Sequence, residues 1–362
     1  MSRINQQKLA EFLNLSQTTV SRALANHPAI NAETKAKVWA HAAQHGYQIP
    51  PAKNRGSRNS NDPVTIGVLI AIPKRERGFA ETSQLALQGI AESSGTETAS
   101  LDVVYQEPSR HNSRQIQKRL RQHRWRGCIL IHPMAEDVVE ALSKTLPCVS
   151  VVENYRLDHF DSVDVDQIEA VGSLVRRLHE LGHRKIGYLS WVYDVPTPWV
   201  YHRFGAYVET MFQLGLPFEK EDVINLRPGE RFSAEEVADK VVRCIEKGTT
   251  AFLCAADHQA YLLRRLLKER GIEVPRDCSL TGFDGIQPAE GEEQVATVCV
   301  PYDEIGRSSL YQLFRRISQP TAPRRHVLVD GEYLEGKSIG PPRAEAHPPD
   351  PPTTIRKRKA SP

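Results

Sequence analysis

The sequence predicts a small all-α domain with a helix-turn-helix, followed by an α/β body of two doubly wound lobes. Three observations lead to this fold class. Short amphipathic stretches with helix-capping residues fill the first 47 positions. Residues 48–63 are polar and rich in Pro, Gly, Ser and Asn, as is typical of a linker. Beyond Pro63, strand-like apolar runs alternate with stretches of helical spacing, which favours parallel sheets covered by helices on both faces.

Three helices are expected in the first domain, which we call the head. The first runs from about Gln6 to Leu13 and the second follows the cap residue Ser16. The third runs from about Ala32 to His45 and stops at Gly46. Only a couple of residues separate the first two helices, so they are expected to cross steeply, as in a helix-turn-helix.

The second helix has two chemically different sides. The apolar side is small and follows the i, i+3, i+4 spacing, with Val20, Ala23 and Leu24. The polar side carries one cation and several hydrogen-bonding groups but no carboxylate, with Gln17, Thr18, Ser21 and Arg22. Such a face suits the major groove of B-DNA, where side chains of these types bind base edges and phosphates. A solvated face on a small helical domain is the alternative.

The charge distribution agrees with a polyanion partner for the head. Residues 1–61 hold eight Lys/Arg against two Glu, a net charge of +6. The tail, residues 341–362, carries +3, so the segment between carries −6 within an overall +3. A basic head on an acidic body suggests that the head alone contacts nucleic acid.

The body is expected to contain eight apolar strand runs. They are residues 64–72, 101–105, 127–131, 148–152, 185–190, 251–255, 278–283 and 295–300. About 280 residues is much for one sheet, so two lobes are predicted. The expected domains are a head (1–48), a linker or hinge (49–62), a two-lobed body (63–340) and a disordered tail (341–362). The lobe boundaries are expected near 63–163 with 293–325, and 164–292 with 326–340.

The cysteines and the hydropathy pattern exclude several classes of protein. Six cysteines lie far apart without paired spacing, which suits buried thiols better than disulfides or zinc ligands. No apolar run follows a basic start, and none approaches membrane-spanning length. We therefore expect a cytoplasmic protein with no membrane contact, no metal and no cofactor. The "RKRK" of the tail (356–359) is expected to be solvated, with DNA contact as the alternative.

The first 47 residues resemble a known DNA-binding domain. "KLAEFLNLSQTTVSRALANHPAINAETKAKVWAHAAQHGY" (8–47) is similar to the amino-terminal domain of the lac repressor / galactose repressor (LacI/GalR) family of bacterial transcription regulators. The resemblance implies that Gln17, Thr18 and Arg22 read bases while Ser16, Thr19 and Ser21 position the helix on phosphates. The full expected set of DNA contacts is Ser16, Gln17, Thr18, Thr19, Ser21, Arg22, Asn26, Lys53 and Arg55.

The resemblance continues through the body to about Gly340. The matching segments, in order, are "VDVDQIEAVGSLVRRLHELGHRKIGYLS", "RFGAY", "TAFLCAADHQA", "GIEVPRDCSLTGFDGI" and "VATVCVPYDEIGR". It implies a body like a periplasmic sugar-binding protein, with a small molecule held between the lobes beyond the carboxyl ends of the strands.

The same resemblance suggests effector contacts. Arg203 matches a cleft arginine, Asp284 an aspartate that accepts from ligand hydroxyls, and Phe232 an aromatic that stacks on the ligand. Asp166 and Asp257 are further candidates. The alternatives are that Asp257 and Asp284 cap the following turns and that Phe232 belongs to the core.

The linker departs from the family pattern. Where the family has a leucine that wedges into the minor groove, this chain has Ala52, and Gly56 interrupts the segment. Lys53, Arg55 and Arg58 could follow the minor groove or the phosphates, and flexible linkage without DNA contact is the alternative.

The sequence therefore predicts a dimeric, sequence-specific repressor of carbohydrate-use genes, bound to a roughly palindromic operator and controlled by a sugar-like effector. A regulator controlled by a partner protein, without small-molecule sensing, is the second hypothesis. An enzyme on this scaffold is the third, and no nucleophile elbow, phosphate loop or metal-spaced cluster supports it. Within a bacterium, such a regulator would lie at the nucleoid.

Overall fold

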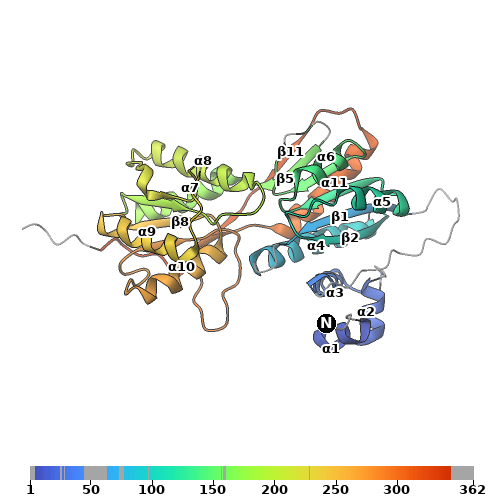
Figure 1. Cartoon of the computed structure of the whole chain (residues 1–362), viewed down its shortest axis with the longest axis horizontal. Helices are drawn as coiled ribbons and strands as arrows, with labels where there is room; N and C mark the ends of the chain where they lie inside the picture. Colours follow the sequence, from blue (N-terminus) through green and yellow to red (C-terminus); the bar gives the residue numbers. More distant parts are fainter. Residues whose placement is uncertain are drawn as a thin grey trace, which may run out of the picture.

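The computed structural model describes residues 5–24, 27, 29–44, 63–72, 77–96, 98–155, 157, 160–227 and 229–343. Two lobes lie side by side along the long axis, and the helical head lies beneath one of them (Figure 1). Lobe 1 is the lobe next to the head and is built on the larger sheet. Lobe 2 is built on the smaller one.

The head contains the three helices that the sequence predicts. They are α1 (Gln6–Leu13), α2 (Gln17–Leu24) and α3 (Ala32–Gln44). The Asn5 side chain accepts from the Lys8 amide at 2.9 Å, and Asn31 accepts from the Thr34 amide at 2.7 Å, which satisfies helix-start donors. Asn14 is in the left-handed region (φ 51°) and turns the chain sharply from α1 into α2.

The head core is continuous with the core of lobe 1. Leu9, Val20 and Trp39, one from each helix, are almost fully buried in the same apolar cluster as the lobe 1 strands. Helix α3 packs against α4, the first helix of lobe 1. Figure 1 shows α3 directly beneath α4. In this conformation the head is therefore docked on lobe 1.

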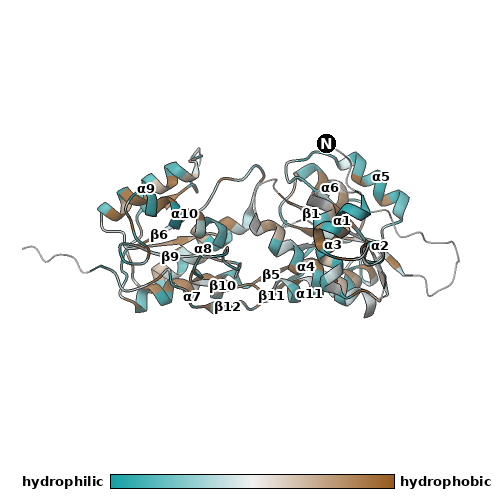
Figure 2. Cartoon of the chain, turned by 90° about the horizontal axis from the view of Figure 1, so that it is seen from below, coloured by the Kyte–Doolittle hydropathy of each residue, from teal (hydrophilic) through white to brown (hydrophobic). Residues whose placement is uncertain are grey.

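Lobe 1 is a parallel sheet of order β11-β5-β4-β3-β1-β2 with helices on both faces. Its strands are β1 (Val64–Ala71), β2 (Ala99–Gln106), β3 (Gly127–Ile131), β4 (Cys148–Val151), β5 (Phe160–Val165) and β11 (His326–Val329). Its helices are α4 (Arg77–Thr96), α5 (Ser113–His123), α6 (Glu136–Ser143) and α11 (Tyr302–Ser318). The strands are brown and the outer surface of α5 is teal in Figure 2, as expected for a covered sheet.

Lobe 2 repeats this design on a smaller scale. Its parallel sheet has the order β7-β6-β8-β9. The strands are β6 (Ile186–Leu189), β7 (Val223–Ile224), β8 (Ala251–Cys254) and β9 (Ser279–Thr281). The helices are α7 (Gln167–Glu180), α8 (Pro198–Gln213), the 3-10 turn η1 (Lys220–Asp222), α9 (Ala234–Glu246) and α10 (Asp257–Glu269).

The lobe boundaries differ from the expected ones near the carboxyl end. The sequence predicts residues 326–340 in lobe 2. In the structure, residues 326–329 form β11, which pairs with β5 in lobe 1. The sequence predicts residues 293–325 in lobe 1. In the structure, strand β10 (Thr297–Cys299) pairs with β12 (Glu332–Leu334). The neighbouring Ala296 forms a β-bridge with Thr281 at the edge of lobe 2. An apolar run such as 295–300 shows where a strand lies but not which sheet it joins, because that choice depends on long-range packing. Residues 326–329 are not among the predicted strand runs, so their pairing with β5 is a finding of the structure.

The cysteines fit the prediction of buried thiols. All six are free, five are buried and Cys299 is intermediate. Within the described residues, no group of His, Cys, Asp and Glu could hold a metal ion. Nor does any helix in that part of the chain have the length and apolarity needed to cross a membrane.

Candidate DNA-binding face and interlobe cleft

The polar face of α2 is presented to solvent. Four of its side chains are exposed, namely Gln17, Thr18, Ser21 and Arg22. The opposite side is anchored, because Val20, Ala23 and Leu24 are buried in the head core. The sequence pattern thus corresponds to a real division between a packed and an open face.

The start of α2 is fixed by its own side chains. The Ser16 hydroxyl accepts from the Thr19 amide at 3.0 Å and shares a 2.8 Å hydrogen bond with the Thr19 hydroxyl. Ser16 is therefore a helix cap, as its place in the sequence predicts. Both hydroxyls keep further capacity to bond, since each oxygen has two lone pairs and one proton.

The electrostatics of this face favour an anionic partner. Helix α2 contains no acidic residue, and the Arg22 guanidinium makes no ion pair with the described residues. Arginine stays protonated at all ordinary pH values and offers a planar fork of donors. The remaining predicted DNA contacts, Asn26, Lys53 and Arg55, lie outside the described residues, as does the whole linker segment 49–62.

A cleft of about 1110 Å³ lies between α4 of lobe 1 and several segments of lobe 2. We call it the outer cleft. Lobe 1 contributes Gly78, Glu81, Thr82, Gln84 and Leu85. Lobe 2 contributes residues 191–192, 232–234 and 284–289, four residues of α10 and Glu292. The cleft lies beyond the carboxyl ends of the strands, where open α/β sheets bind ligands.

Arg203 lies at the deep end of this region and is only 2% exposed. Its Nε donates to Gln167 Oε1 at 3.0 Å, Nη1 to the Ala255 carbonyl at 2.5 Å and Nη2 to Asp284 Oδ1 at 3.1 Å. The guanidinium also lies over the Phe283 ring, 3.7 Å from its centroid. The residue is placed in the cleft region as predicted, but protein acceptors already engage each of its nitrogens.

Asp284 connects the two lobes. Its Oδ1 accepts from Arg203 of lobe 2 and from the Tyr302 hydroxyl of lobe 1 at 2.8 Å. Burial raises the pKa of Asp284, and the Arg203 charge opposes that rise. Its φ of 116° is unusual for a residue with a side chain, which is typical of a functional or tightly constrained position. Tyr302 was missed from the sequence, although "VPYDEIGR" contains it.

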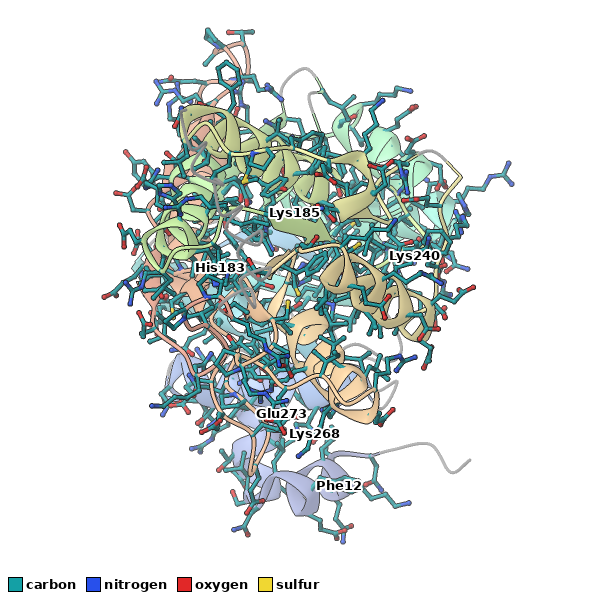
Figure 3. The ribbon with its side chains drawn as sticks, turned by 90° about the vertical axis from the view of Figure 1, so that its left-hand side faces the viewer. Phe12, His183, Lys185, Lys240, Lys268 and Glu273 are labelled. Atoms are coloured by element: carbon teal, nitrogen blue, oxygen red, sulfur yellow. The ribbon has the colours of Figure 1, made fainter. Side chains whose placement is uncertain are left out.

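Phe232 lines the outer cleft, as predicted, together with Trp191. The Lys240 ammonium lies 3.8 Å from the centroid of the Phe232 ring. Lys240 belongs to α9 and is labelled in Figure 3. This cation fixes the ring, and the ring contributes an apolar wall to the cleft.

Asp166 and Asp257 have structural contacts instead of lining the cleft. Asp166 caps α7 by accepting from the Ile168 and Glu169 amides at 3.0 and 3.1 Å. Asp257 is 0% exposed and accepts from the Ile286 amide at 2.7 Å, which braces the loop that follows Asp284. Asp257 does not cap the turn that follows it, because the bond goes to a distant loop and α10 has no side-chain cap. Neither carboxylate lines a described pocket.

Two histidines at the deep end were not singled out from the sequence as effector contacts. His132 and His258 come from different lobes, and both line a small pocket beside Arg203. Burial lowers the pKa of each to about 4, so both are neutral at pH 7. A histidine next to an apolar run has no local sequence pattern that would show that it lines a pocket.

Comparison with known proteins agrees with this arrangement. The periplasmic binding protein-like domain family matches residues 175–339. The HTH-type transcriptional repressor MelR of Bacillus subtilis (strain 168) is 27% identical over 343 residues, covering 90% of this chain and 94% of MelR. The transcriptional regulator CelR–cellobiose complex superposes with a TM-score of 0.63 at 19% identity, over 93% of this chain and 100% of CelR.

The lac repressor dimer bound to operator and the anti-inducer ONPF gives a TM-score of 0.60 at 20% identity, over 94% of this chain and 100% of that one. At these identities the solved structures establish the fold. The helix-turn-helix head and the two doubly wound lobes therefore give this chain the fold of these proteins, and its sequence is similar to that of the MelR repressor over 90% of its length.

Proposed function

We propose that this chain represses carbohydrate-use genes by binding an operator through α2, and that a sugar-like effector between the lobes changes its affinity for that operator. The observation that carries the proposal is the exposed, carboxylate-free face of α2 on a basic head. Gln17, Thr18 and Arg22 read bases, and Ser16, Thr19 and Ser21 contact phosphates. Asn26, Lys53 and Arg55 extend the contact along the duplex.

The proposed assembly is a homodimer on a roughly palindromic operator in the bacterial cytoplasm. Two heads related by a two-fold axis match two half-sites, which explains why one short helix can be sufficient for specificity. The similar lac repressor structure is described as a dimer bound to operator, which supports this assembly here. The effector is inferred from the outer cleft and from the cellobiose in the similar CelR complex.

The DNA-reading role is tested by fluorescence anisotropy against DNA from the region upstream of the gene. Gln17→Ala and Arg22→Ala should each weaken operator binding by about 10- to 100-fold, since a bidentate base contact contributes about 1–3 kcal/mol. Arg243→Ala, at an exposed arginine on α9 of lobe 2, is the matched control and should leave affinity unchanged. Equal binding of operator and scrambled DNA by the wild-type protein would contradict the proposal.

A further inference from the structure

Protein side chains fill the deep end of the cleft. Phe79, at the start of α4, is only 6% exposed. Its ring centroid lies 4.7 Å from that of His132, 5.8 Å from that of Tyr193 and 6.2 Å from that of His258. One lobe 1 side chain therefore packs between aromatic and imidazole rings of both lobes.

The space left beside these rings is very small. The pocket lined by Phe79, Arg203 and Asp284 measures about 20 Å³, which is room for about one water molecule. No sugar ring fits there while Phe79 keeps this position. The deep subsite around Arg203 is closed by the protein itself.

The polar groups of this subsite are also engaged. All three nitrogens of Arg203 donate to protein acceptors, and Asp284 Oδ1 accepts from both Arg203 and Tyr302. A ligand that used these groups would have to break buried, charge-assisted hydrogen bonds. Leaving such partners unsatisfied costs about 1–3 kcal/mol each.

The outer cleft, unlike the deep pocket, has space for a ligand and carries polar side chains available to it. It is about fifty times larger than the deep pocket and exceeds the usual range of about 300–1,000 Å³ for drug-sized ligands. Its walls include three aromatic rings, namely Trp191, Phe232 and Tyr261. Two carboxamides face it, Gln84 and Gln287, and neither makes a side-chain hydrogen bond with any described residue.

These features suit a ligand with several rings and many hydroxyls. Aromatic faces pack against the apolar face of a sugar ring, and carboxamides both donate to and accept from hydroxyls. The ion pair between Arg265 and Glu292, 2.9 Å apart, adds a donor and an acceptor at the rim. A single sugar ring would leave most of this surface uncovered.

We propose that the effector is an oligosaccharide of two or more units held in the outer cleft, and that Phe79 is the specificity-determining residue that keeps a single sugar out of the deep subsite. This inference rests on the proposed function, because it assumes that the cleft binds a sugar. It goes further by naming the size of the ligand, its subsite and the side chain that selects it.

Isothermal titration calorimetry on the full-length protein tests the inference. The probes are glucose, galactose and ribose as monosaccharides, and cellobiose, maltose, sucrose and cellotriose as oligosaccharides. Wild-type protein should bind at least one oligosaccharide and bind every monosaccharide at least tenfold more weakly. Phe232→Ala should weaken oligosaccharide binding at least fivefold, because it removes an aromatic wall of the outer cleft.

Phe79→Ala opens the deep subsite and should strengthen monosaccharide binding at least tenfold. Phe212→Ala, at an 85% exposed phenylalanine of α8, is the matched control and should change neither class of ligand. Phe79→Leu makes a smaller space and serves as the second variant if circular dichroism shows that Phe79→Ala does not fold. Phe79→Leu should also strengthen monosaccharide binding, but by a smaller factor than Phe79→Ala.

Three results would overturn the inference. They are tighter binding of a monosaccharide than of any oligosaccharide by the wild type, unchanged monosaccharide binding in both Phe79 variants, and no saccharide binding at all. An operator titration on the same sample separates the two proposals. If operator binding persists while all saccharides fail, DNA recognition stands and sugar sensing does not.

Discussion

At the scale of single residues, the chemistry of the cleft is governed by a few buried charges. Asp284 accepts from Arg203 of lobe 2 and from Tyr302 of lobe 1, so one carboxylate ties the lobes together. Asp257 lies behind it and holds the next loop through the Ile286 amide. The charge of Asp284 raises the cost of ionising the buried Asp257 carboxyl.

This burial makes stability depend on pH through Asp257. Burial, together with the charge of Asp284, raises the pKa of Asp257 to about 7, against 3.8 for a free aspartate. The folded protein thus holds a proton that the unfolded chain releases, so the free energy of unfolding should fall as pH rises from about 4 to about 7. Asp164, whose pKa burial also raises to about 7, should act in the same direction.

Asp257→Asn should therefore reduce the loss of stability between pH 5 and pH 8, as measured by urea unfolding at both values. The amide oxygen can still accept from Ile286, so the fold is retained. Asp194→Asn, in an exposed loop, is the control and should follow the wild type. An unchanged pH dependence in the Asp257 variant would show that this carboxyl is ionised in the fold.

At the scale of elements, α4 is the helix that contacts the cleft, the head and α11. It lines the cleft, carries Phe79 and packs against both α3 of the head and α11. The packing against α11 is close because two glycines face the partner backbone. A Cβ on Gly89 would lie 1.8 Å from the Asp303 carbonyl oxygen, and one on Gly306 would lie 2.1 Å from that of Ala86.

Gly306→Ala should lower the free energy of unfolding by about 1–3 kcal/mol, because backbone atoms cannot yield to the added methyl group. Gly205→Ala in α8 is the matched change, since nothing lies within 4 Å of its Cβ. That variant should be stabilised by about 0.5–1 kcal/mol through helix propensity. Thermal and urea unfolding measure both. Equal effects at the two positions would mean that α4 and α11 are not in close contact.

Helices and their caps could be predicted from sequence more easily than the sheet that each strand joins. The helices α1 and α2 and the cap Ser16 follow from capping chemistry and apolar spacing, which act over a few residues. The places of β10 and β11 could not be predicted in this way. Both are short apolar strands, and only the packing of distant segments decides which sheet they join.

At the scale of the whole molecule, three chain crossings join the lobes, and the head is docked on lobe 1. The three crossings come directly after β5, β10 and β11. Family resemblance is sufficient to predict two lobes with a cleft between them. It could not predict that Phe79 fills the deep end, because the position of that ring depends on how the lobes close.

Closure of the lobes is the proposed route from effector to operator. A ligand between α4 and lobe 2 changes the lobe arrangement, and α4 contacts the head through α3. Such coupling between sites typically amounts to about 1–3 kcal/mol, or a 5- to 150-fold change in affinity. Because linkage is reciprocal, the operator must change ligand affinity by the same factor.

The most direct test of this account is the operator Kd of the full-length protein, measured by anisotropy with and without saturating cellobiose, maltose or another saccharide that binds in calorimetry. We predict a 5- to 150-fold change for one saccharide, with the same factor when that saccharide is titrated into the protein–operator complex. An operator Kd that no bound saccharide alters would contradict the account.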